Sequence, residues 1–167
     1  MTKVTFFKWL TTAVLIGGIA MSVYFFSTPT FSHDYKQLTE RVEVGLKYSN
    51  PDDETIYFQP YIENPNSSSD LTLTHGHNFI KMYVLDEHGN ILEDSVTTNK
   101  NDNTTDGKLQ TTLSPGEQEK NTDYYKINFP DNADRLQVTI EGEVEDEFGL
   151  DEIEEIIEVD VDYFNNI

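Results

Sequence analysis

The body of the chain alternates apolar and polar residues with a period of two, and this pattern constrains the fold more than any other feature of the sequence. In the first such stretch, Val42, Val44, Leu46 and Tyr48 occupy every second position. Successive side chains of a strand point to opposite faces of a sheet, so this spacing predicts strands with one buried face. The expected strands lie at residues 42–48, 56–62, 71–73, 79–85, 91–92, 109–113, 125–129, 136–144 and 157–163.

Eight or nine short strands without a long amphipathic helix predict an all-β fold. Two antiparallel sheets packed face to face bury such strands with few exposed edges, so we expect an immunoglobulin-like antiparallel β-sandwich over residues 41–167. Pro60 lacks a backbone N–H, which predicts an edge strand or a bulge at that point. Leu150 and Ile153 are three residues apart, and a helical turn before the last strand stays open as an alternative.

The first 32 residues differ in composition from the rest of the chain. Trp9–Phe26 is a run of 18 residues without a charge. As a helix it would be roughly 27 Å long, close to the hydrocarbon thickness of a bilayer. We therefore predict a transmembrane helix or uncleaved signal anchor at residues 9–26, which contacts the lipid bilayer. The alternative is a signal peptide cleaved after Thr30-Phe31-Ser32.

The basic residues near this run predict its orientation. Lys3 and Lys8 precede it, so the positive-inside rule places residues 1–8 in the cytoplasm. Residues 27–40 would then be a linker to an extracytoplasmic domain. The expected location is the cell membrane, in a single-pass topology with the C-terminal domain outside the cell.

Acidic residues outnumber basic ones by 31 to 11, which gives a formal net charge of −20 at pH 7. Twelve of the acids lie between Glu141 and Asp162, after the last basic residue, Arg135. Nucleic acid is repelled by such a surface and is excluded as a partner. We interpret the charge as a solvated acidic face, with binding of cations or of a basic partner as the alternative.

The sequence lacks cysteine and the motifs of several common enzyme and metal sites. The chain has no cysteine, which excludes cysteine-ligated zinc, iron–sulfur clusters, disulfides and thiol catalysis. It also lacks the G-x-S-x-G, H-E-x-x-H, G-x-x-x-x-G-K-[ST] and S-x-x-K motifs. We therefore expect no enzyme activity, no catalytic residue and no cofactor.

Two short motifs resemble the beginnings of metal sites. His75 and His77 would face one side of a strand, but the sequence offers no third ligand nearby and Gly76 between them favours a turn with exposed histidines. Asp102, Thr104 and Asp106 resemble an EF-hand loop. Its twelfth position is Leu113, where a bidentate Glu is required. No metal ligand is predicted at either place.

The acidic stretch near the C-terminus offers oxygen ligands of the kind that hard cations prefer. Its carboxylates belong to Glu143, Glu145, Asp146, Glu147 and Asp151. Because the stretch has no defined ligand geometry, it predicts at most weak, millimolar binding of calcium or another divalent cation.

The order of turns and strands resembles the BsuPI-type intracellular proteinase inhibitor family of bacilli. The residues that carry this resemblance lie between about residues 55 and 140, and they are the turn Glu63-Asn64-Pro65-Asn66, the strand Leu71-Thr72-Leu73-Thr74, the break His75-Gly76-His77, the hairpin Asp86-x-x-Gly89 and the turn Leu113-Ser114-Pro115-Gly116-Glu117. The resemblance implies an immunoglobulin-like β-sandwich and, as an activity, protease inhibition. It assigns no inhibitory residue.

Taken together, these features predict a membrane-anchored extracytoplasmic binding module without catalytic activity, which contacts a protein partner that the sequence does not identify. We expect its contact surface at a sheet edge near Pro60 or in the polar loop Thr97–Lys108, because edges accept added strands and loops on a rigid sandwich carry recognition. A protease inhibitor of the BsuPI type is the first alternative. A weak calcium-binding surface protein is the second.

Overall fold

The computed structural model describes residue 14 and residues 29–50, 55–99 and 107–165. The chain divides into two compact units, Met1–Thr30 and Phe31–Ile167. Apart from residue 14, the predicted span at residues 9–26 lies outside the described residues. Within the described ranges, no helix combines the length and the apolar character that a membrane crossing requires.

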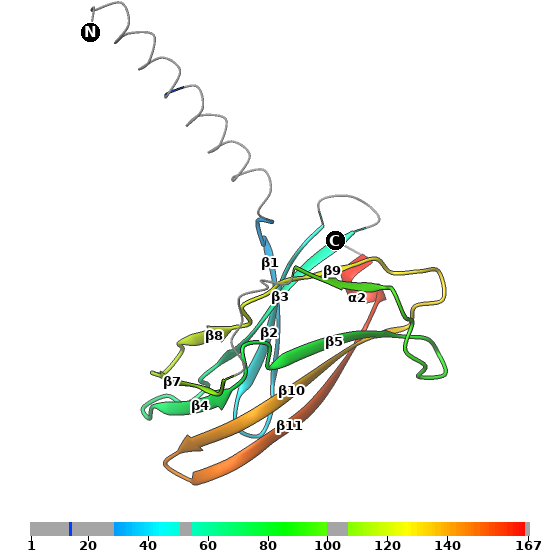
Figure 1. The fold of residues 1–167 in the computed structure, drawn as a ribbon. Coiled ribbons are helices and arrows are strands. Elements are labelled where there is room, and N and C mark those ends of the chain that lie inside the picture. Colours follow the sequence, from blue (N-terminus) through cyan, green and yellow to red (C-terminus); the bar gives the residue numbers. More distant parts are fainter. Residues whose placement is uncertain (1–13, 15–28, 51–54, 100–106, 166–167) are drawn as a thin grey trace, which may run out of the picture. The chain divides into compact units, whose positions relative to one another are not determined.

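In the described part of the second unit, eleven strands form two antiparallel sheets (Figure 1). The first sheet has the order β1 (His33–Leu38), β2 (Glu43–Ser49), β3 (Ile56–Glu63), β9 (Tyr125–Ile127) and β6 (Val96–Thr98), and β8 (Gln118–Lys120) also pairs with β3. The second has the order β11 (Gly149–Asp160), β10 (Arg135–Asp146), β4 (Leu71–His75) and β7 (Leu109–Leu113), and β5 (Ile80–Leu85) also pairs with β10. A short helix, α2 (Asp162–Asn165), follows β11. The predicted antiparallel β-sandwich is confirmed.

The core lies between the sheets and draws on the apolar positions of the alternating pattern. Its fully buried members include Leu46 of β2, Leu73 of β4 and Ile140 of β10. Phe164 of α2 is also fully buried, with its ring 5.0 Å from that of Phe58 and 5.2 Å from that of Tyr48. Each fully buried side chain of this size contributes about 2 kcal/mol.

One close approach in the first sheet depends on a glycine. The ring of Tyr61 on β3 lies over Gly45 of β2, where a Cβ atom would be 1.9 Å from the Tyr61 Cζ. The Tyr61 hydroxyl donates to Asp34 of β1 at 2.8 Å. Tyr61 therefore connects three strands, and β2 can accommodate it only because residue 45 has no side chain.

Pro60 does not mark an edge, so the expected edge near it is wrong. β3 is an inner strand that pairs with β2 on one side and with β8 and β9 on the other. Residues 56–58 pair with β9 and residues 61–63 with β8, which leaves Pro60 between the two segments. Its carbonyl accepts from Asn121 N–H at 3.0 Å on that side. The missing N–H faces the same gap, where no ladder bond is required.

The ends of the sandwich differ from the sequence prediction in three places. β1 occupies part of the segment expected to be a linker at residues 27–40, and none of its residues is fully buried. The last strand begins at Gly149, so the alternative of a helical turn at Leu150 and Ile153 is wrong. This strand ends at Asp160, before α2. Of the predicted loop Thr97–Lys108, its first two residues belong to β6, while residues 100–106 lie outside the described residues.

Candidate functional site

The longest element of the sandwich is the hairpin formed by β10 and β11, drawn in orange in Figure 1. Each strand has 12 residues, and the register runs from Arg135 opposite Asp160 to Asp146 opposite Gly149. Two residues form the turn, where the Asp146 carboxylate accepts from Phe148 N–H at 2.8 Å. Gly149 has a φ of 107°, which a residue with a side chain rarely adopts. The local sequence thus favours a tight turn here.

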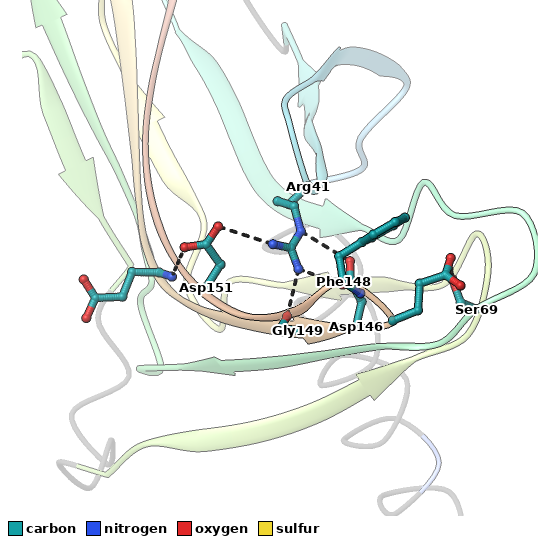
Figure 2. A network of polar contacts seen from close by, with 8 residues as sticks. Arg41, Ser69, Asp146, Phe148, Gly149 and Asp151 are labelled. Carbon is teal, nitrogen blue, oxygen red and sulfur yellow. Dashed lines mark hydrogen bonds and ion pairs between the residues drawn. The ribbon is translucent and has the colours of Figure 1, made fainter.

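Arg41, in the connection between β1 and β2, fastens this turn to the other sheet (Figure 2). Its guanidinium donates to both carboxylate oxygens of Asp146, at 2.7 and 3.3 Å. It also donates to Asp151 at 3.3 Å and to the carbonyl of Gly149 at 2.9 Å. On the other side of the turn, the Ser69 hydroxyl donates to the Glu147 carboxylate at 3.2 Å. The hairpin end is therefore held from two directions.

β11 is the last strand of its sheet and pairs with β10 alone among the described residues. Next to the ladder, Val161 N–H donates to the Asp134 carbonyl at 3.0 Å. Backbone groups alternate in direction along an antiparallel strand, so the odd-numbered residues of β11 face β10. The N–H and C=O groups of the even-numbered residues, from Leu150 to Asp160, point away from the sheet. They form a free edge, which can accept another strand.

The same even-numbered residues place their side chains on the outer face of the sheet. Leu150 is 69% exposed and Ile156 is 60% exposed, although both are large and apolar. Glu152 and Glu154 lie between them at alternate positions, and both are exposed. We call Leu150, Glu152, Glu154 and Ile156 the β11 edge set. It combines free backbone groups, two apolar side chains and two carboxylates.

The negative charge of this face is only partly compensated. Glu152 and Glu154 lie directly opposite Glu143 and Glu141 of β10. The glutamates on β10 have partners, because Lys81 donates to Glu141 at 2.9 Å and Lys108 to Glu143 at 2.6 Å. These hydrogen bonds raise the pKa of each lysine. Within the described part of the chain, no basic side chain forms an ion pair with Glu152 or Glu154.

The structure separates the two histidines that the sequence places in one motif. His75 ends β4 and is buried, not exposed as expected, with its Nδ1 2.6 Å from the carbonyl of Gly76 and its ring 4.3 Å from that of Phe79. Its Nε2 has no hydrogen-bond partner. His77 lies half-buried in the following turn. Among the described residues, no group of three acidic or histidine side chains is placed to hold a metal ion.

The carboxylates expected to bind calcium weakly do not converge. Asp146 and Asp151 pair with Arg41, and Glu147 accepts from Ser69. Glu143 pairs with Lys108, and Glu145 is exposed on the outer face. The EF-hand-like residues Asp102, Thr104 and Asp106 lie outside the described residues, while Leu113 is a buried residue of β7.

Two of the turns that carry the family resemblance, at Glu63–Asn66 and Leu113–Glu117, contact each other. The buried side-chain amide of Asn64 donates to the carbonyls of Leu113 and Ser69, at 2.8 and 2.9 Å. Its backbone carbonyl accepts from Gly116 N–H at 3.0 Å. Gly116 and Gly89 have φ values of 77° and 80°, as turns of the predicted kind require. These residues join strands and present no reactive group.

Sequence reasoning missed the β11 edge set, although the sequence contains a signal for it. Leu150, Glu152, Glu154 and Ile156 follow a period of two whose parity is opposite to that of the buried residues Ile153 and Ile157.

Comparison with protein-family models finds no match, and comparison with curated proteins finds none either. Among solved structures, the GAE domain of GGA2p from Saccharomyces cerevisiae matches with 12% identity and a TM-score of 0.42, over 75% of this chain and 96% of that one. The yeast GGA1 GAE domain matches with 5% identity and a TM-score of 0.38, over 76% and 98% of the two chains. The fold assignment therefore rests on the strand pairing described above.

Proposed function

We propose that this chain is a membrane-anchored, extracytoplasmic interaction module without catalytic activity, and that its contact surface is the free edge of β11. The observation that carries the proposal is a strand of 12 residues that has a partner on one edge alone among the described residues, with two large apolar side chains exposed beside the backbone groups of its free edge. A free, long edge of this kind is a template for strand addition.

Two further features support an interaction role. Arg41 and Ser69 hold the hairpin end, so the edge is presented without having to be ordered on binding. The uncharged run Trp9–Phe26, preceded by Lys3 and Lys8, supports a membrane anchor with the sandwich outside the cell.

The compartment can be tested on intact cells. A C-terminal epitope tag on the full-length chain should be digested by added protease without cell lysis, because the proposal places the sandwich outside. A cytoplasmic tagged protein serves as the control and should stay intact. A tag that is protected until the cells are lysed contradicts the proposed location.

The edge can be tested with a pair of proline variants. Ile156→Pro removes an N–H that points away from β10, so the strand keeps its ladder bonds but loses one edge donor. The matched control is Leu38→Pro on β1. Thr39 N–H donates to the Val42 carbonyl at 2.9 Å, so the N–H of the 65%-exposed Leu38 faces away from β2. The two variants thus alter the free edges of different sheets.

From solubilised membranes, the full-length wild type and Leu38→Pro should retain a protein partner that Ile156→Pro loses. Equal recovery by all three proteins places the contact elsewhere and contradicts the proposal. Recovery of no partner above background also contradicts it.

Protease inhibition, implied by the resemblance to the BsuPI-type family, is the alternative function. The Asp86–Gly89 and Leu113–Glu117 turns, which carry the resemblance, form in the structure with the expected positive φ at Gly89 and Gly116. The full-length chain should then inhibit a subtilisin-like protease, and no loss of activity at a large molar excess rules this alternative out.

A further inference from the structure

We propose that the partner of the β11 edge is an extended, basic segment of another protein, which carries apolar, basic, basic and apolar residues at four successive alternate positions. It adds to β11 as an antiparallel strand. This inference rests on the proposed function and names the chemistry that the edge selects.

The order of side chains on the β11 edge set dictates this pattern. A strand paired with β11 would place every second side chain directly beside Leu150, Glu152, Glu154 and Ile156 on the outer face. Such cross-strand neighbours have Cβ atoms about 5 Å apart, close enough for apolar contact and for ion pairs. Apolar residues therefore fit beside Leu150 and Ile156, and lysine or arginine beside the two glutamates.

The charges already present on the sheet strengthen this selection. Glu152 and Glu154 face Glu143 and Glu141 across the hairpin, and among the residues described Lys81 and Lys108 form ion pairs only with the latter two. Like charges opposite one another destabilise a sheet. A basic strand on the other side of β11 would relieve this repulsion, because it supplies cations to Glu152 and Glu154.

A second copy of the chain is a poor occupant of the same edge. If two β11 strands paired antiparallel about the centre of the set, Glu152 of each copy would lie beside Glu154 of the other. The acidic edge therefore disfavours self-association. The free backbone groups run from Leu150 to Asp160, about 33 Å at the usual rise of a strand, so the complementary segment needs about ten residues.

The test uses the full-length chain in micelles of a zwitterionic detergent and fluorescein-labelled synthetic peptides, with binding followed by fluorescence anisotropy. The probe peptide contains Val-Thr-Lys-Thr-Lys-Thr-Val flanked by Ser-Thr at each end. Its control contains Lys-Thr-Val-Thr-Val-Thr-Lys between the same flanks, so composition and charge are identical. The probe should bind at least about tenfold more tightly than the control, because only the probe matches the order of the edge set.

Backbone pairing can be separated from charge attraction by a single N-methyl group. In the antiparallel arrangement, the lysines of the probe direct their N–H groups toward β11 and the threonines direct theirs away. N-methylation of one central lysine should weaken binding more than about tenfold, since it blocks the pairing sterically as well as removing a donor. N-methylation of the central threonine should leave affinity within about twofold. If N-methylation of the threonine weakens binding as much as N-methylation of the lysine, or more, the proposed pairing is overturned.

Variants of the chain complete the test. Glu152→Gln with Glu154→Gln should weaken probe binding by roughly tenfold, at about threefold for each exposed charge, and should reduce its dependence on salt. Ile156→Pro should abolish it, while Leu38→Pro should bind like the wild type. Equal binding of probe and control peptide, or affinity unchanged by the double substitution, overturns the inference.

The failure of this inference can be distinguished from failure of the proposed function. If Ile156→Pro loses a membrane partner but the probe peptide does not bind, the edge is a contact surface for a segment of different chemistry. If the wild type binds neither a partner nor the probe, both proposals fail. A dimer that forms through Ile156 in sedimentation experiments identifies a second copy as the occupant and overturns the inference.

Discussion

Replacing Arg41 should loosen the end of the hairpin that presents the proposed contact edge. Arg41 is the only described basic residue that pairs with Asp146, whose side chain is 2% exposed. Arg41→Met keeps most of the aliphatic stem but removes the charge and all four hydrogen bonds to the hairpin. The Asp146 carboxylate then remains buried, with Phe148 N–H as its remaining donor.

The size of the effect follows from the burial of the two partners. Breaking a fully buried ion pair costs about 3–5 kcal/mol, and a hydrogen bond to a charged group contributes about 1.5–3 kcal/mol. The Arg41 side chain is 21% exposed, so water screens part of its interaction. We therefore expect Arg41→Met to lower the free energy of unfolding by about 2–3 kcal/mol.

Urea unfolding of the full-length chain in a mild detergent, followed by far-UV circular dichroism, measures this change. The midpoint should fall while the slope stays constant, because the surface exposed on unfolding is unchanged. Arg41→Lys is the charge-retaining control and should lose less stability than Arg41→Met, because it keeps a positive charge beside Asp146. It should still be less stable than the wild type, since an ammonium group cannot reproduce the bidentate contact.

A second substitution distinguishes a buried charge from simple loss of packing. Asp146→Asn keeps an acceptor for Phe148 N–H but carries no charge, so it should restore about 1–2 kcal/mol when added to Arg41→Met. The reasoning is refuted if Arg41→Met lies within about 0.5 kcal/mol of the wild type, or if the double variant is less stable than Arg41→Met alone.

Two further predictions concern buried tyrosines of the sandwich. Gly45→Ala should cost about 2–3 kcal/mol in the wild type but less than about 1 kcal/mol beside Tyr61→Ala, because the added Cβ would lie 1.9 Å from the Tyr61 ring; equal costs in the two backgrounds, measured by urea unfolding, contradict this. Burial raises the pKa of Tyr48 and of Tyr125 to about 12, above the unfolded value of about 10, so their contribution to stability should be complete below pH 10 and lost as the pH rises through about 12. Unfolding measured at pH 9 and pH 11.5 checks this, and Tyr125→Phe should reduce the loss; a free energy of unfolding that is equal at the two pH values contradicts it.

The alternating pattern predicts the interior of the sandwich because the apolar residues at every second position are the ones that the strands bury there. Val44, Leu46 and Tyr48 on β2 are apolar and buried, while the charged residues at the alternate positions, Glu43 and Lys47, are only half-buried. Where no side chain of a strand is fully buried, apolar and polar residues need not alternate. The sequence then does not predict the strand. This is why β1 was expected to be a linker: its side chains alternate only between half-buried and exposed.

Long-range contacts explain two other differences. Pro60 is compatible with an inner strand only because β8 and β9 pair with different segments of β3 and leave Pro60 between them. No local feature of the sequence predicts this gap in the pairing. Arg41 and Asp146 are separated by 105 residues, so their pairing could not be anticipated from spacing. By contrast, the sequence predicts the turns at Gly89 and Gly116. Such turns need a residue with positive φ, and glycine adopts it without steric cost, so the signal is local.

The residues that hide β11 in the sequence are the ones on which its proposed contact edge depends. Ile153 and Ile157 point into the core, while Leu150 and Ile156 point outward, so apolar residues occupy both faces and the period of two is hidden. A strand that served only to close the sheet would gain nothing from the two outward apolar side chains, and polar residues there would make the edge safer against aggregation. Local sequence rules are broken most often where a function requires it. The departure from the pattern at these two positions therefore supports the proposal that the β11 edge binds a partner, and Glu152 and Glu154 between them support the proposal of a basic one.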